Sequence, residues 1–168
     1  MDRKSFDGTR WTIAFGSYDG LEGYAVDQVY KVIQRSVPYV LTAGPTDKPA
    51  PADHNVLLIG TADSNPRIAA LVRDGSLKIP AGRTGTTGSF AIRVFPDPAN
   101  PKLKLAVLAG ADAAGVLCSV RDFEHFYADP SLYRGEYYYG SWRCFVDEMP
   151  DWSHNGSPAI SDRAAFKK

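Results

Sequence analysis

The residues best placed to do chemistry are carboxylates among aromatic side chains near the C-terminal end of the sequence. Asp147, Glu148 and Asp151 lie close to Trp142 and Trp152. Paired carboxylates can cleave glycosidic bonds, one as the acid that protonates the leaving group and the other as base or nucleophile. A polar segment that packs its aromatic side chains against the rest of the protein explains the same pattern more simply. We favour this second interpretation and expect no catalytic residue here.

The same segment contains a run of three tyrosines that is followed closely by tryptophan. Aromatic side chains with charged neighbours suit either a platform that stacks on sugar rings or a surface that contacts another protein. A protein partner is our preferred hypothesis, and a stand-alone carbohydrate-binding module is the alternative. The residues predicted to form this binding surface are Tyr137, Tyr138, Tyr139, Trp142 and Trp152.

The other candidate groups do not form a recognisable site. The three histidines, His54, His125 and His154, share no metal-ligand spacing, and Cys118 and Cys144 form no CxxC pair. The glycine-rich stretch at 82–88 precedes an expected strand instead of opening a helix, so it lacks the helix N-terminus that binds phosphate. We therefore expect reduced thiols, no metal and no cofactor.

The composition is that of an ordinary globular protein. The chain has 168 residues, of which 44% are hydrophobic, and this suffices for one domain with its own core. Nineteen basic and nineteen acidic residues cancel, so no overall charge favours nucleic acid or an anionic membrane as a partner. The N-terminal residues contain no apolar signal segment, which favours a cytoplasmic location if Met1 is the native start. The oligomeric state is left open.

Hydrophobic patterning predicts the elements that would carry these side chains. Continuous apolar runs or strict alternation indicate strands, and apolar residues at intervals of three and four indicate helices. Leu21, Ala25, Val29 and Ile33 form one such helical stripe, for example. The strands are expected at 11–16, 39–41, 55–60, 89–95 and 103–109, and the helices at about 21–37, 66–74 and 113–127.

Three helix starts are marked by polar residues. Asp19 and Glu22 have the spacing of a capping box, in which the carboxylate at the third position bonds back to the cap residue. Asn65 followed by Pro66 is a typical N-cap and first-turn pair, and Asp112 is placed to cap the last helix. Gly115, in the first turn of that last helix, would allow it to approach the sheet closely.

The order of these elements predicts the fold class. Helices connect some strands, while others follow each other directly, which indicates an α+β (mixed α/β) fold. We expect a small mixed sheet layered with about three helices. From the size of the chain we place the helices on a single face, as a two-layer sandwich.

Several of these stretches resemble the small N-terminal domain that precedes the catalytic barrel in some glycoside hydrolases. The β-N-acetylhexosaminidases, in which it is "domain 2", and the α-glucuronidases are the best-known carriers. The shared features are a strand that ends in Ile59-Gly60-Thr61, a helix that starts at Asn65-Pro66, and the strand at Gly88–Val94. The last feature is the apolar strand that leads through Ala109–Gly115 into a final helix.

The resemblance covers residues 10–128 and implies a hexosaminidase domain 2-like fold, followed by an aromatic-rich extension at 129–168. It implies a non-catalytic accessory domain of a glycoside hydrolase, with no catalytic residue of its own, that packs beside a (β/α)8 barrel. Such a barrel needs about 250 residues, so we expect it to belong to a longer parent chain. The implied partner is therefore the barrel of the parent protein, with carbohydrate as the second candidate.

Overall fold

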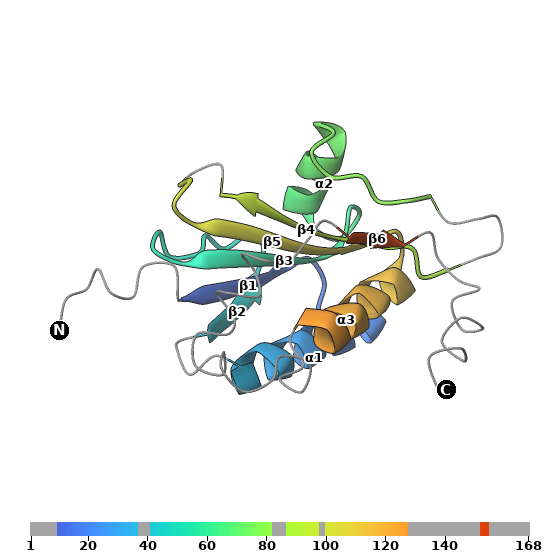
Figure 1. Ribbon diagram of the computed structural model, residues 1–168, viewed down its shortest axis with the longest axis horizontal. Coiled ribbons are helices and arrows are strands. Elements are labelled where there is room, and N and C mark those ends of the chain that lie inside the picture. The colour runs from blue at the N-terminus through green and yellow to red at the C-terminus, as the bar shows by residue number, and fades with distance from the viewer. Residues whose placement is uncertain (1–9, 37–40, 82–86, 98–99, 128–151, 155–168) are drawn as a thin grey trace.

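The computed structural model describes residues 10–36, 41–81, 87–97, 100–127 and 152–154. Within them the chain forms one mixed sheet with three helices, which confirms the predicted α+β class (Figure 1). The strands are β1 (Trp11–Phe15), β2 (Leu41–Pro45), β3 (Asn55–Thr61), β4 (Phe90–Pro96), β5 (Lys104–Gly110) and β6 (Trp152–His154). The helices are α1 (Gly20–Ser36), α2 (Pro66–Arg73) and α3 (Ala113–Tyr127).

The sheet combines a parallel half with an antiparallel half. The strand order is β2-β1-β3-β5-β4-β6, in which β2, β1, β3 and β5 run parallel and β4 runs antiparallel to both of its neighbours. β4 and β5 are joined through the proline-rich connection that the sequence predicted as a hairpin, and Asp97 N donates to Leu103 O at 2.8 Å where it begins. β6 was not expected, because its three residues are too few to show a period.

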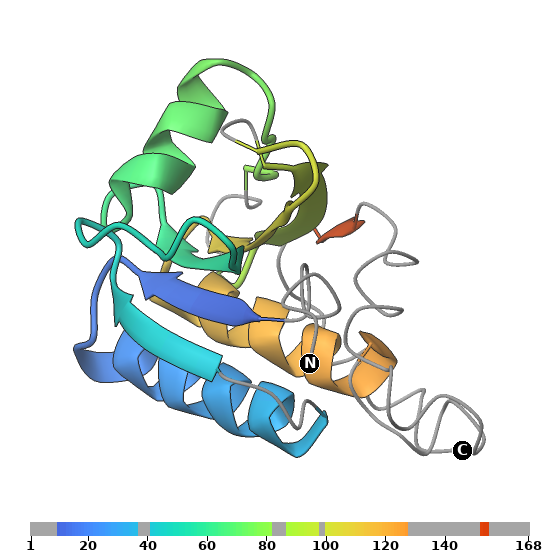
Figure 2. The same ribbon diagram turned by 90° about the vertical axis from the view of Figure 1, so that its left-hand side faces the viewer.

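The helices lie on both faces of the sheet (Figures 1 and 2). α1 and α3 pack side by side on one face, where Val29, Ile33 and Phe123 are fully buried against the strands. α2 packs on the opposite face, where Ile68 belongs to a second cluster with Leu58 and Val107. The structure thus differs from the expected two-layer sandwich by a short third layer. β3 is buried along its whole length, as a strand covered on both faces must be.

The apolar stripe of α1 is confirmed except at its start. Ala25, Val29 and Ile33 are buried as predicted, but Leu21 is 50% exposed. The inward positions of the first turn are taken instead by Glu22 and Gly23, both buried. The sequence pattern could not show this, because the orientation of a first turn depends on what its side chains meet.

The first turn of α3 lies directly against the backbone before β4, and Gly115 makes this possible. A Cβ built on Gly115 would lie 2.1 Å from Ser89 O, a backbone atom just before β4. No side chain fits at that distance, so the predicted role of Gly115 is confirmed.

Gly115→Ala is therefore expected to displace α3 and to lower the free energy of unfolding by about 2–3 kcal/mol or more. Gly44→Ala in β2 is the matched control, because a Cβ there meets nothing within 4 Å. It should leave stability unchanged or slightly raised, since glycine weakens strands. Urea unfolding followed by circular dichroism measures both variants, and equal stabilities would contradict the close-packing argument.

Candidate functional site

The first place to look for a site in this sheet is where β1 and β3 end. From the end of β1 the chain passes through α1 to β2, which pairs with one side of β1. It then continues to β3, which pairs with the other side of β1. Open α/β sheets bind their ligands in the crevice at the carboxyl ends of the strands, where the strand order reverses in this way. The loops after β1 and β3 therefore form the default candidate site.

Asn65 fills this crevice. Its side chain is fully buried, and its Nδ2 donates to Ala14 O at 3.2 Å and to Ile59 O at 3.1 Å, which joins β1 to β3. Its Oδ1 accepts from Arg67 N at 3.1 Å and from Thr46 Oγ1 at 3.2 Å. These two bonds connect the same side chain to the first turn of α2 and to the loop after β2. The cap was predicted from the sequence, but the bonds to the two strands were not.

A second set of bonds closes the same edge. Ser64 Oγ donates to Glu22 Oε2 at 2.7 Å and accepts from Thr61 N at 3.0 Å, so it links the start of α1 to the loop after β3. The two loops also touch, because a Cβ on Gly16 would lie 2.4 Å from the carbonyl of Ser64.

This arrangement shows that the predicted capping box at Asp19 is wrong. Glu22 bonds to Ser64 instead of reaching back, and Asp19 N donates to Ser17 Oγ at 3.2 Å. A carboxylate in the first turn of a helix can bond either to the backbone of the cap residue or to a group far away in the sequence. Here Glu22 bonds to the Ser64 hydroxyl instead of the local backbone.

Asp112, which follows β5, makes similar bonds further along the same edge of the sheet. Its Oδ1 accepts from Gly115 N at 2.6 Å, which confirms the predicted cap of α3. Both carboxylate oxygens also lie 3.3 Å from Gly88 N, just before β4. The side chains of Asn65, Ser64, Glu22 and Asp112 therefore bond to the protein itself, which makes this edge a structural junction.

The opposite edge of the sheet contains a buried histidine. His54 is 6% exposed, and its Nδ1 lies 2.9 Å from Thr12 Oγ1, which in turn lies 2.8 Å from Thr42 Oγ1. Burial lowers the pKa of His54, and the positive charge of Arg10 lowers this pKa further. The Asp53 carboxylate, 4.0 Å from His54 Nε2, acts in the opposite direction. This row of hydrogen bonds ties β1 and β2 to the turn before β3.

Exposed apolar side chains gather on the outside of the helical layer. Tyr18, just before α1, and Leu21 and Tyr24, in its first turns, are 55%, 50% and 46% exposed. The Tyr18 hydroxyl donates to Asp27 Oδ1, and this hydrogen bond raises the pKa of the phenol. The Tyr18 ring also packs on Phe15, with 5.2 Å between ring centroids. The apolar pattern of the sequence did not indicate this surface, because it placed Leu21 in the core.

The binding surface predicted at the C-terminal end is not tested by the structure. Tyr137, Tyr138, Tyr139 and Trp142 lie outside the described residues, as do the carboxylates at 147, 148 and 151. Trp152 lies in β6, where its backbone pairs with Ile92.

Within the described ranges the protein has neither a metal-binding cluster nor a membrane-spanning helix. No group of three or more His, Cys, Asp or Glu side chains there is arranged to hold a metal ion. None of the described helices has the length and hydropathy needed to cross a membrane.

Comparison with known proteins gives a distant structural similarity and no match in sequence. No family model and no curated protein matches the chain. Among solved structures, the chain is similar to a GH138 enzyme targeting pectin rhamnogalacturonan II, with a TM-score of 0.47 and 9% sequence identity. The match covers 86% of this chain and 15% of that enzyme, so the chain corresponds to a small part of that glycoside hydrolase's length.

Asn65→Ala should destabilise the protein strongly, because it removes a helix cap and the two side-chain hydrogen bonds to Ala14 O and Ile59 O, of which Ile59 O keeps the longer bond from Gly16 N, at 3.3 Å. We expect a loss of about 3 kcal/mol or more in the free energy of unfolding. Asn100→Ala is the matched control: the side chain of Asn100 accepts a local bond from Lys102 N in an exposed turn, and the loss of that bond should cost about 1 kcal/mol or less. Chemical denaturation of both variants makes the comparison, and similar losses would refute the role given to Asn65.

The buried histidine predicts a pH dependence of stability. Since the folded-state pKa of His54 is lowered, the unfolded chain binds more protons as the pH falls. This contribution to stability is therefore complete above about pH 6.5 and is lost as the pH falls below that value. Denaturation curves at several pH values should show a shallower decline for His54→Gln than for the wild type. Parallel declines would contradict the prediction.

Proposed function

We propose that this chain is a non-catalytic accessory domain of a glycoside hydrolase of the β-N-acetylhexosaminidase or α-glucuronidase type, and that it packs beside the enzyme's (β/α)8 barrel. The class of parent enzyme comes from the sequence resemblance. In that arrangement the acid, base or nucleophile belongs to the barrel, at the carboxyl ends of its strands.

The observation that carries the non-catalytic role is the closed junction at the ends of β1 and β3. The side chain of Asn65 bonds to the ends of β1 and β3, and the Ser64 hydroxyl bonds to Glu22 in α1. These bonds lie at the edge where an α/β sheet would hold a substrate. If one of these side chains were directed at a substrate instead, the fold would lose hydrogen bonds that join β1, β3 and α1. A rigid framework uses such groups in this way, whereas a catalytic crevice leaves polar atoms directed at a ligand.

The residues that carry the resemblance support the same interpretation. Asn65 and Asp112 cap helices, and Gly115 lets α3 lie against the backbone before β4. Each of these roles is structural, so the shared features describe how a framework is built and place no reactive group.

The purified 168-residue chain should therefore turn over no aryl glycoside in a broad panel that includes N-acetylhexosaminides and glucuronides. The longest open reading frame that contains the chain should add a barrel and should show glycosidase activity. Release of the chromogenic aglycone is the measurement.

An Asp147→Asn, Glu148→Gln double variant is the control for the isolated chain. Turnover by the wild-type chain that this variant abolishes would overturn the proposal. It would place catalysis in the C-terminal segment of this chain instead.

A further inference from the structure

The segment that connects β2 to β3, residues 46–54, is held to the protein at few points. It runs on the side of the sheet that carries α2 (Figure 2). Within this segment only His54 is buried, while Thr46 and Ala50 are partly buried and the other residues are exposed. Segments with few buried contacts are the ones that open locally while the rest of a protein stays folded. The free energy that keeps this segment closed therefore depends strongly on His54.

The His54 ring holds the end of this segment against β1 and β2. Its Nδ1 lies 2.9 Å from Thr12 Oγ1, which lies 2.8 Å from Thr42 Oγ1 on the edge strand. The backbone of the next residue is bonded as well, because Asn55 N donates to Arg10 O at 2.8 Å. Movement of the ring into solvent would therefore break its bond to Thr12 and expose that hydroxyl to water.

Few groups act on the charge of this ring. β1, β2 and β3, which meet at this point, contain no ionisable residue. Burial lowers the pKa of His54, the Asp53 carboxylate at 4.0 Å from Nε2 raises it, and the Arg10 guanidinium lowers it. The closed segment therefore holds a neutral imidazole, whereas in an open segment the ring would lie in water and titrate near its ordinary pKa of about 6.5.

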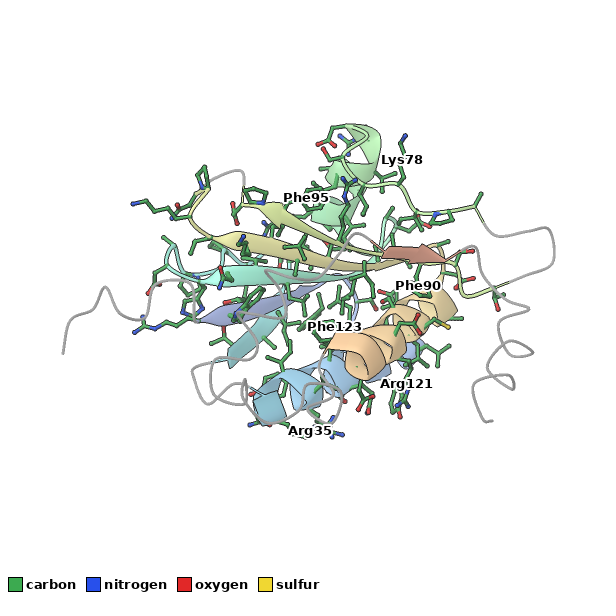
Figure 3. The ribbon with its side chains drawn as sticks, in the orientation of Figure 1. Arg35, Lys78, Phe90, Phe95, Arg121 and Phe123 are labelled. Atoms are coloured by element: carbon green, nitrogen blue, oxygen red, sulfur yellow. The ribbon has the colours of Figure 1, made fainter. Side chains whose placement is uncertain are left out.

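We propose that protonation of His54 opens the 46–54 segment while the sheet and its helices stay folded. The opening uncovers Thr12 and the edge of the hydrophobic cluster against which Ala50 packs, so the protein presents a different surface in mildly acidic solution. The core on the other face does not depend on this segment, since Phe90 and Phe123 are buried in the separate cluster between the sheet and the two long helices (Figure 3). The opening is independent of the proposed function.

Closing the segment requires a neutral ring, so the contribution of His54 to closure is complete above about pH 6.5 and is lost as the pH falls below that value. Hydrogen exchange measured by mass spectrometry follows the opening through the peptide that contains His54 and Asn55. Its protection factor is the exchange rate of an unstructured chain divided by the observed rate at the same pH. This factor should fall about threefold to tenfold between about pH 7.5 and about pH 5.5, because one proton is taken up on opening. Constant protection would overturn the proposal.

Exchange in low concentrations of urea distinguishes local opening from unfolding of the whole domain. The peptide that contains His54 and Asn55 should exchange faster than β5. Its protection should not change as urea is added below the unfolding transition, because local opening exposes little surface. The protection of β5, which pairs with β3 and β4, should fall with urea, because that strand exchanges through global unfolding. Equal protection and equal urea dependence of the two peptides would overturn the local opening.

Replacement of the histidine identifies the group that takes up the proton. His54→Gln keeps a side chain that can form hydrogen bonds but does not titrate, so the protection of the same peptide should no longer change with pH. His125→Gln is the matched control and should retain the wild-type response to pH. The same response in both variants would show that another group drives the opening and would overturn the proposal. If His54→Gln does not fold, the pH and urea dependence of the wild-type chain still decide between the outcomes.

Discussion

The buried amide of Asn65 is the interaction on which the rest of this structure depends. It satisfies the carbonyls of Ala14 and Ile59 at the ends of two adjacent strands and caps the helix that follows. A buried carbonyl without a donor costs about 1–3 kcal/mol, so these bonds contribute directly to the stability of the fold. The same bonds that hold β1, β3 and α2 together therefore close the edge at which many α/β proteins bind substrate.

The two helices on one face of the sheet are fixed by contacts near their first turns. Glu22 bonded to Ser64 fixes the start of α1, and Gly115 against Ser89 O fixes α3. With both helices anchored to the sheet, the outward side chains of the two helices meet at a defined distance, as the bond between Tyr24 and Arg121 shows.

Much of the fold could be predicted from the sequence because its signals are local. Continuous apolar runs indicated β3 and β5, and the caps at Asn65 and Asp112 depend on backbone groups only two or three residues away. The capping box failed because Glu22 had a competing partner far away in the sequence, Ser64. The placement of α2 and the pairing of β6 also depend on the whole sheet, so periodicity could not show them.

By itself the sequence determined the class of fold, most element positions, two helix caps and the close approach at Gly115. Only the tertiary structure decided that Asn65 joins β1 to β3, that Glu22 faces inward while Leu21 faces outward, and that Tyr24 meets Arg121. The first group of features follows from interactions within a few residues or along one periodic face. The second group joins residues that are from 6 to 97 positions apart, and strand order and helix placement determine which of them meet.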